Sequence, residues 1–190
     1  MNFKTDYIAR LFQKTGHKRI GNYFVTRLWQ KRNNPDTTFN PKHWSQMGHI
    51  SVTDNLSARN VEDICTIFGA DFGKTKRGFL RRGGIQHPGN SDYVIWWPTS
   101  PGRNSWVNEV SDNDATITET HKDDYTRRQH YHNHKDTAQK RIVFLHRKDI
   151  LGLTSYKFTG VYEYDRKQSS EEKGVVWSRC RGEVDVVSPQ

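Results

Sequence analysis

Residues 156–164 read YKFTGVYEY, and this stretch decides the fold class that the sequence predicts. Its aromatic residues alternate with other residues, a period of two that is typical of a β-strand with one buried face. The side chains expected to share that face are Tyr156, Phe158, Tyr162 and Tyr164. Gly160 interrupts the aromatic pattern and predicts a bend or a bulge in the strand.

Four further stretches are rich in Val, Ile, Thr and aromatic residues, and clusters of Gly, Pro, Asn and Asp separate them. They are DYVIWWP at 92–98, ATITET at 115–120, RIVFLHR at 141–147 and VVWSRCRGEV at 175–184. Five strands that follow a helical region predict a curved β-sheet or a partly closed barrel with flanking helices. The expected fold class is therefore α+β.

Helical periodicity dominates the first third of the chain. Apolar residues at three- and four-residue spacing predict a helical hairpin over about residues 3–31. The stretch KRNNPDTTFNPKHW at 31–44 contains two prolines and predicts a linker or loop. A further helix is expected to begin at a Ser57 cap and to end at Gly69. Its apolar stripe consists of Val61, Ile64, Cys65 and Phe68.

The charge balance favours a polyanionic partner. The 190 residues include 30 Lys and Arg against 21 Asp and Glu, a formal net charge of +9. Basic proteins gain affinity for nucleic acids from counterion release. No apolar run approaches the length of a membrane span, and the first residues lack the apolar core of a secretory signal. With only Cys65 and Cys180 present, we expect a cytoplasmic protein without a disulfide framework or a thiolate metal cage.

A basic segment punctuated by glycines, FGKTKRGFLRRGG at 72–84, is expected to lie along a DNA backbone. The predicted phosphate contacts are Lys74, Lys76, Arg77, Arg81 and Arg82. The alternative is a solvated surface loop. GADFGKT at 69–75 differs from a nucleotide-binding loop, because it has three residues between its glycines instead of four and follows a helix instead of a strand. No nucleotide or other cofactor is therefore expected.

The run HKDDYTRRQHYHNHKD at 121–136 contains four histidines beside Asp123 and Asp124. Histidines that alternate on a strand can share a metal ion. No suitably spaced carboxylate ligand accompanies these histidines, so the sequence predicts no metal site. We expect a polar, mobile loop next to DNA.

The stretch NSWVNEVSDNDATITE at 104–119 contains the candidate binding residues Trp106, Asn108 and Glu119. An Asn amide both donates and accepts, a carboxylate accepts from an exocyclic amino group, and an indole can stack on a base. Together they are suited to the Watson–Crick edge of a cytosine extruded from a duplex. The alternative gives each residue a structural role: Trp106 as a core anchor, Asn108 in a turn and Glu119 on a solvated strand.

Several segments resemble the C-terminal domain of modification-dependent restriction endonucleases that act on 5-hydroxymethylcytosine and its glucosylated form. They are FGADFGKTKRGFLRRGGIQHP, DYVIWWP, SWVNEVSDNDATITE and KRIVFLHRKDILGLTSYKFTGVYEYDRKQSSEEKGVVWSRC. The resemblance covers about residues 44–187. It implies an SRA-like (SET and RING associated) curved barrel related to PUA-like modules, in which Trp106, Asn108 and Glu119 line the pocket for a flipped base. It also implies a bacterial or phage-infected cell.

The chain departs from that family between its two parts. KTDYIARLFQKTGHKRIGNYFVTRLWQ at 4–30 resembles the helical start of the same enzymes, in which a Vsr-like nuclease core of PD-(D/E)xK type follows. Here only a short connection follows, and Asp36 is its sole carboxylate. We therefore expect a helical segment at 1–31, a linker at 32–44 in place of the nuclease core, and an SRA-like domain at 45–190.

The leading hypothesis is a module that binds double-stranded DNA containing 5-hydroxymethylcytosine, glucosylated or not, by base flipping and without cleavage. One alternative is a regulator or inhibitor that pairs with a full-length related endonuclease. The expected protein partner is such an endonuclease or a second copy of this chain. Another alternative is a residual nuclease that uses the His and Asp cluster at 121–136. A third is the binding of single-stranded RNA.

Overall fold

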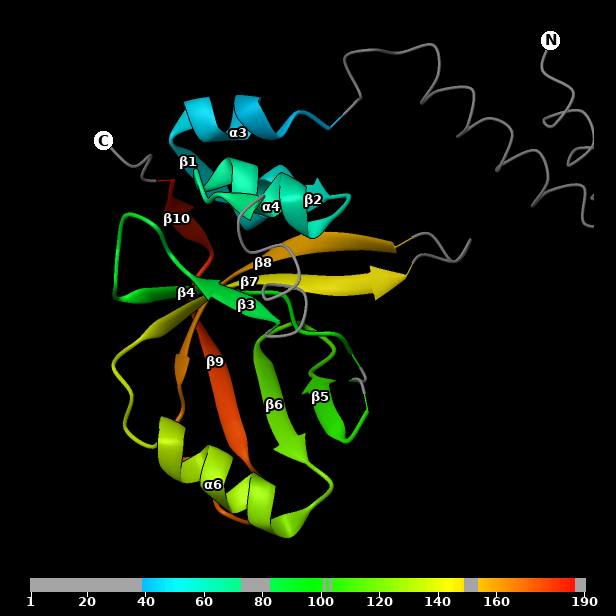
Figure 1. Ribbon diagram of the computed structural model, residues 1–190, viewed down its shortest axis with the longest axis vertical. Helices are drawn as coiled ribbons and strands as arrows, with labels where there is room; N and C mark the ends of the chain where they lie inside the picture. The colour runs from blue at the N-terminus through cyan, green and yellow to red at the C-terminus, as the bar shows by residue number, and fades with distance from the viewer. Residues whose placement is uncertain (1–38, 73–82, 101, 103, 149–153, 187–190) are drawn as a thin grey trace, which may run out of the picture. The chain divides into compact units, whose positions relative to one another are not determined.

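An eight-stranded sheet organises the part of the chain that the computed structural model describes, which comprises residues 39–72, 83–100, 102, 104–148 and 154–186. Its path runs β3 (Gly84–Gln86), β4 (Tyr93–Trp96), β7 (Lys140–Lys148), β8 (Thr154–Tyr164), β9 (Val175–Arg181), β6 (Thr116–His121) and β5 (Trp106–Val110), and β2 (Ser57–Ala58) pairs with β8. Neighbouring strands are antiparallel except β4 and β7, which are parallel. The sheet is curved and does not close (Figure 1), which confirms the expected α+β class.

Residues 1–39 and 40–190 form two separate compact units, and all the elements described below belong to the second unit. The predicted hairpin at 3–31 and the predicted phosphate contacts Lys74, Lys76, Arg77, Arg81 and Arg82 lie outside the described residues. A second, two-stranded sheet pairs β1 (His49–Ser51) with β10 (Glu183–Asp185). In this sheet the first described strand of the unit pairs with its last described strand.

Strand β8 contains the bulge that Gly160 predicts. Val143 pairs with Gly160 whereas Phe144 pairs with Phe158, so Thr159 is an extra residue on β8. An extra residue reverses the alternation of side chains beyond it. Tyr162 therefore faces the same cluster as Val143, whereas Phe158 packs against Phe144 on the other face. The prediction that Tyr156, Phe158, Tyr162 and Tyr164 share one face is thus wrong.

The helices flank the sheet at two places (Figure 1). α3 (Pro41–Met47), the 3₁₀ helix η2 (Val52–Asp54) and α4 (Val61–Ile67) lie near β1 and β10, and α6 (Asp124–His134) packs on β6 and β9. The cap of α4 is Asn60, whose side chain accepts from the Asp63 amide, and not Ser57 as expected. Gly69 has the left-handed conformation (φ 66°) that ends a helix, as predicted.

Two stretches expected as loops are partly helical. α3 begins inside the stretch 31–44, where the Asn40 side chain accepts from the Lys42 amide and Pro41 occupies the first turn. α6 replaces the mobile loop expected at 121–136. Asp123 caps it by accepting from the Thr126 amide at 2.8 Å, and no residue of α6 is buried. The helix thus lacks the apolar stripe by which sequence analysis recognises helices.

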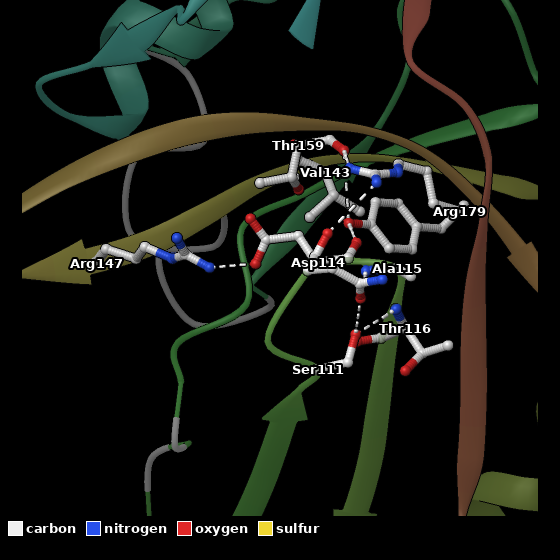
Figure 2. A network of polar contacts seen from close by, with 10 residues as sticks. Ser111, Asp114, Ala115, Thr116, Val143, Arg147, Thr159 and Arg179 are labelled. Atoms are coloured by element: carbon white, nitrogen blue, oxygen red, sulfur yellow. Dashed lines mark hydrogen bonds and ion pairs between the residues drawn. The ribbon is translucent and has the colours of Figure 1, made fainter.

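The turn between β5 and β6 is anchored to the rest of the sheet by a polar network (Figure 2). Asp114 adopts a left-handed conformation (φ 56°), its carboxylate forms an ion pair with Arg147, and its carbonyl accepts from the Tyr162 hydroxyl at 2.5 Å. Within the turn, the Ser111 hydroxyl accepts from the Thr116 amide at 3.0 Å. Because β5 and β6 carry the candidate residues, this network fixes the hairpin on which those residues lie.

Substitution Tyr162→Phe is expected to lower the free energy of unfolding by about 1 kcal/mol, because the Asp114 carbonyl loses its donor while the ring packing is kept. Urea unfolding followed by tryptophan fluorescence measures the change. Tyr125→Phe is the matched control, since Tyr125 is 73% exposed and loses little with its hydroxyl. Equal stability of the two variants would contradict the anchoring role of Tyr162.

Candidate base-binding site

The register of β5 and β6 brings the candidate residues together. Asn108 and Glu119 are directly opposite each other in the antiparallel pair, and Trp106 is two residues along β5 on the same face. All three line one cleft of about 1310 Å³. The sequence-predicted cluster is therefore a spatial cluster in the structure.

Two glycines allow the close backbone approaches that shape this region. A Cβ on Gly174 would lie 2.5 Å from the Glu119 carbonyl oxygen, and one on Gly102 would lie 2.3 Å from the Trp106 carbonyl oxygen. Both glycines also have positive φ, 97° and 118°. Any other residue at either position would strain the backbone that carries a candidate side chain.

One carboxylate oxygen of Glu119 collects three contacts. Glu119 Oε2 accepts from Arg141 Nη1 at 2.9 Å and from Trp177 Nε1 at 3.3 Å. His130 Nε2 lies 3.1 Å from the same oxygen. The contacts come from β7, β9 and α6, so Glu119 joins three elements that are distant in sequence. The second oxygen, Oε1, takes part in none of these contacts.

Arg141 packs against two indole rings. Its guanidinium carbon lies 3.7 Å from the centroid of Trp177 and 4.3 Å from that of Trp96, and the residue is only 8% exposed. A desolvated guanidinium over an indole face gains roughly 2 kcal/mol or more. The two rings therefore compensate part of the cost of burying the cation, and Glu119 supplies the counter-charge.

Helix α6 forms a histidine wall next to Trp106. The ring centroid of His130 lies 4.7 Å from that of Trp106 and 4.3 Å from that of His134. His121 packs against Trp106 from β6 at 4.9 Å. Both contacts to Trp106 are edge-on, at 71° and 67° between ring planes. The indole is thus oriented by rings from two elements.

The electrostatics of the cluster keep Glu119 ionised. Burial alone would raise the pKa of Glu119, but the Arg141 guanidinium, assisted by His130 and His134, outweighs it and lowers the pKa to about 2. Burial also lowers the pKa of His134, and nearby Arg141 lowers it further. At neutral pH the carboxylate is therefore an acceptor only.

Asn108 presents a second acceptor. Its Nδ2 donates to the Thr99 carbonyl at 3.1 Å, which fixes the orientation of the amide because a carbonyl oxygen cannot be the donor in this pair. Its Oδ1 is buried and has no hydrogen-bond partner. A buried acceptor without a donor costs about 1–3 kcal/mol, a cost that a donor on a ligand would recover.

Several residues of the cluster were missed by sequence analysis, namely Trp96, His130, His134, Arg141 and Trp177. Arg141 had a usable signal, because it shares the apolar face of its strand with Val143 and Leu145. Within the described ranges, no three His, Cys, Asp or Glu side chains are placed to hold one metal ion. No helix in the same ranges is long and apolar enough to cross a membrane.

A family model for the SET and RING associated (SRA) domain matches residues 43–186, which include the whole cluster. The chain belongs to the SRA family. Among solved structures, "The 5-Hydroxymethylcytosine-Specific Restriction Enzyme AbaSI" is similar, with 29% identity and a TM-score of 0.70. The similarity covers all of this chain and 59% of that enzyme, so this chain spans less than two thirds of its length. No curated protein matches.

These findings confirm the resemblance to the SRA-like domain of modification-dependent restriction enzymes. The individual roles of Trp106, Asn108 and Glu119 in contact with a base stay predictions.

Substitution Glu119→Gln is expected to weaken the acid dependence of stability. The folded-state pKa of Glu119 is depressed from 4.5 to about 2. Its ionised form therefore stabilises the fold fully above about pH 4.5, and this stabilisation is lost as the pH falls towards 2. Urea unfolding of the wild type between about pH 6 and about pH 3 should show a steeper loss of stability than that of the variant.

The variant should also be less stable at neutral pH, by about 3–5 kcal/mol, because Arg141 loses its counter-charge. Glu109→Gln is the matched control, since Glu109 is exposed on β5. Parallel pH profiles for the wild type and Glu119→Gln would show that Glu119 is not the group held ionised by the cluster.

Proposed function

We propose that this SRA domain binds duplex DNA containing 5-hydroxymethylcytosine or its glucosylated form, takes the modified base into the cleft by flipping it, and does not cleave the DNA. The observation that carries the proposal is the pair of acceptors on β5 and β6. Glu119 is ionised, and the Asn108 Oδ1 atom has no partner. Such a pair suits a ligand that presents hydrogen-bond donors.

Cytosine and its 5-substituted forms present such donors. The exocyclic N4 amino group of cytosine carries two hydrogens. In a duplex this edge is hidden in the base pair, so the base must leave the stack to reach Glu119 and Asn108. Flipping costs a few kcal/mol, and hydrogen bonds to Glu119 and Asn108 and contact with Trp106 are expected to compensate this cost.

The size of the cleft suits a bulky 5-substituent. Pockets for drug-sized ligands are commonly about 300–1,000 Å³, and this cleft has about 1310 Å³. A base with a hydroxymethyl or glucosyl group on C5 therefore has room. The related enzyme AbaSI is named as specific for 5-hydroxymethylcytosine, which supports the same class of ligand for this chain.

The positive charge of the chain supports contact with the DNA backbone. The net charge of +9 favours phosphate binding. We propose Lys74, Lys76, Arg77, Arg81 and Arg82 as backbone contacts. Affinity for any duplex should then fall steeply with salt, whereas preference for the modified base should change much less, because only phosphate contacts release counterions.

The substitution Trp106→Ala is expected to reduce affinity for a 5-hydroxymethylcytosine duplex by at least about tenfold, since stacking or wall contacts of an aromatic ring with a base are worth about 1–3 kcal/mol. Affinity for the unmodified duplex should change little. Fluorescence anisotropy titrations on matched duplexes with cytosine, 5-methylcytosine, 5-hydroxymethylcytosine or its glucosylated form, at two salt concentrations, measure both. Tyr125→Ala, on the exposed side of α6, is the control.

Equal affinity of the wild type for all four duplexes would overturn the proposed function. A parallel set with magnesium tests cleavage, and cut products would favour the residual nuclease. Flipping is tested with 2-aminopurine next to the modified base, since unstacking raises its fluorescence. An increase on binding that Trp106→Ala abolishes would support flipping, and unchanged fluorescence in the bound wild type would count against it.

A further inference from the structure

We infer that Arg141 is a positioning residue that makes the cleft select cytosine-type bases over uracil-type bases with the same 5-substituent. The inference rests on the proposed function and assigns a role to a side chain at the back of the cluster. It concerns discrimination at position 4 of the base, where cytosine has an amino group and uracil has a carbonyl.

Arg141 lines the cleft, and its side chain is placed to act on Glu119. Indole rings pack against the guanidinium at 3.7 Å and 4.3 Å, which holds it in place beside Glu119. Its Nη1 donates to Glu119 Oε2 at 2.9 Å. This contact, with Trp177 Nε1 at 3.3 Å, commits one carboxylate oxygen to the protein. The carboxylate plane is thereby restrained, and Oε1 is left for a ligand.

An ionised carboxylate discriminates between the two base types by its hydrogen-bonding capacity. It can only accept hydrogen bonds, so it pairs with the N4 amino group of cytosine. The O4 atom of a uracil-type base is itself an acceptor and would face Glu119 without a donor between them. A buried polar group left unpaired in this way costs roughly tenfold or more in affinity. The Asn108 Oδ1 acceptor increases the same preference.

This discrimination is lost when Glu119 is protonated, and Arg141 prevents the protonation. Burial of a carboxyl group favours its neutral form, which both donates and accepts. The groups that face Glu119 are Arg141 from β7, His130 and His134 from α6, Trp177 from β9 and Asn108 from β5. Arg141 is the one permanent cation among these groups. Discrimination by Glu119 therefore depends on the cation that Arg141 places beside the carboxylate.

The substitution Arg141→Met tests this role, because it keeps an unbranched side chain against the indoles and removes the charge. The ligands are two duplexes that differ only in 5-hydroxymethylcytosine or 5-hydroxymethyluracil. Each modified base is placed opposite an abasic site, so that neither has a pairing partner to lose. The wild type should favour the cytosine-type duplex by at least about tenfold. In Arg141→Met this ratio should fall towards one.

A pH series separates positioning from mere packing. Between about pH 8 and about pH 6 the ratio for Arg141→Met should fall further, because the buried Glu119 takes up a proton in that variant. In the wild type Glu119 stays ionised over this range, so it should contribute no change in the ratio with pH. Both proteins contain His130 and His134, so the difference between the two profiles reports on Glu119. Arg141→Lys, which keeps the charge, should restore most of the ratio.

Two further variants keep the test decisive. Arg141→Met combined with Glu119→Gln leaves no unpaired buried charge, so it is expected to fold even where the single variant is unstable. Its ratio should be low and independent of pH. Arg166→Met removes a surface ion pair with Asp136 in which the Arg166 side chain is 78% exposed, and it should behave as the wild type. Thermal unfolding checks that each protein is folded.

The outcomes distinguish the two proposals. A wild type with no preference for 5-hydroxymethylcytosine over cytosine refutes the proposed function. A wild type that prefers the modified duplex but does not separate the cytosine-type from the uracil-type base overturns the inference alone. The inference is also overturned where folded Arg141→Met, or the folded double variant if the single variant does not fold, keeps the wild-type ratio at every pH.

Discussion

The buried ion pair between Glu119 and Arg141 is the constraint on which the arrangement of the site depends. Two charges in the protein interior are tolerated only when they are paired and when neighbouring polar groups and aromatic faces compensate their lost hydration. Here the two indoles pack against the cation, Trp177 Nε1 on β9 donates to the anion, and His130 Nε2 on α6 lies 3.1 Å from it. The strands and the helix must therefore meet at this point, and their meeting forms the back of the cleft.

The surrounding fold holds this cluster through backbone irregularities. The extra residue at Thr159 lets one long strand serve two cores, so that Phe158 packs with Phe144 while Tyr162 reaches the aromatic cluster and the turn at Asp114. Gly174 lets β9 approach the backbone of Glu119 closely. These features act at a distance from the cleft, yet they set the register on which its geometry depends.

Short-range alternation predicts the strands β4, β6, β7, β8 and β9, and the chemistry of Trp106, Asn108 and Glu119 together with the family resemblance points to the cluster. The sequence analysis does not predict β5, on which Trp106 and Asn108 lie. It does not predict α6, because that helix has no apolar stripe and its cap at Asp123 is a weak signal by itself. It also does not predict that Arg141 meets Glu119. That contact depends on which strands are neighbours, and β7 and β6 are separated in the sheet by β8 and β9. The one-residue bulge reversed the expected faces, because the alternation of aromatic residues was carried through the irregularity that Gly160 indicates.

The polar character of α6 affects how its detachment from the sheet would respond to denaturant. The helix has no buried residue, and its attachments are largely ion pairs, hydrogen bonds and ring edges, such as Arg127 Nε to the Glu171 carbonyl at 3.0 Å. Its detachment would expose the part of Tyr131 that packs against the aromatic cluster and the edge of Trp177 that His134 covers, less apolar surface than unfolding of the sheet exposes. Sensitivity to denaturant scales with newly exposed surface, so such an opening would depend on urea less than global unfolding does. Its backbone amides would then exchange with solvent by local opening, long before the sheet unfolds.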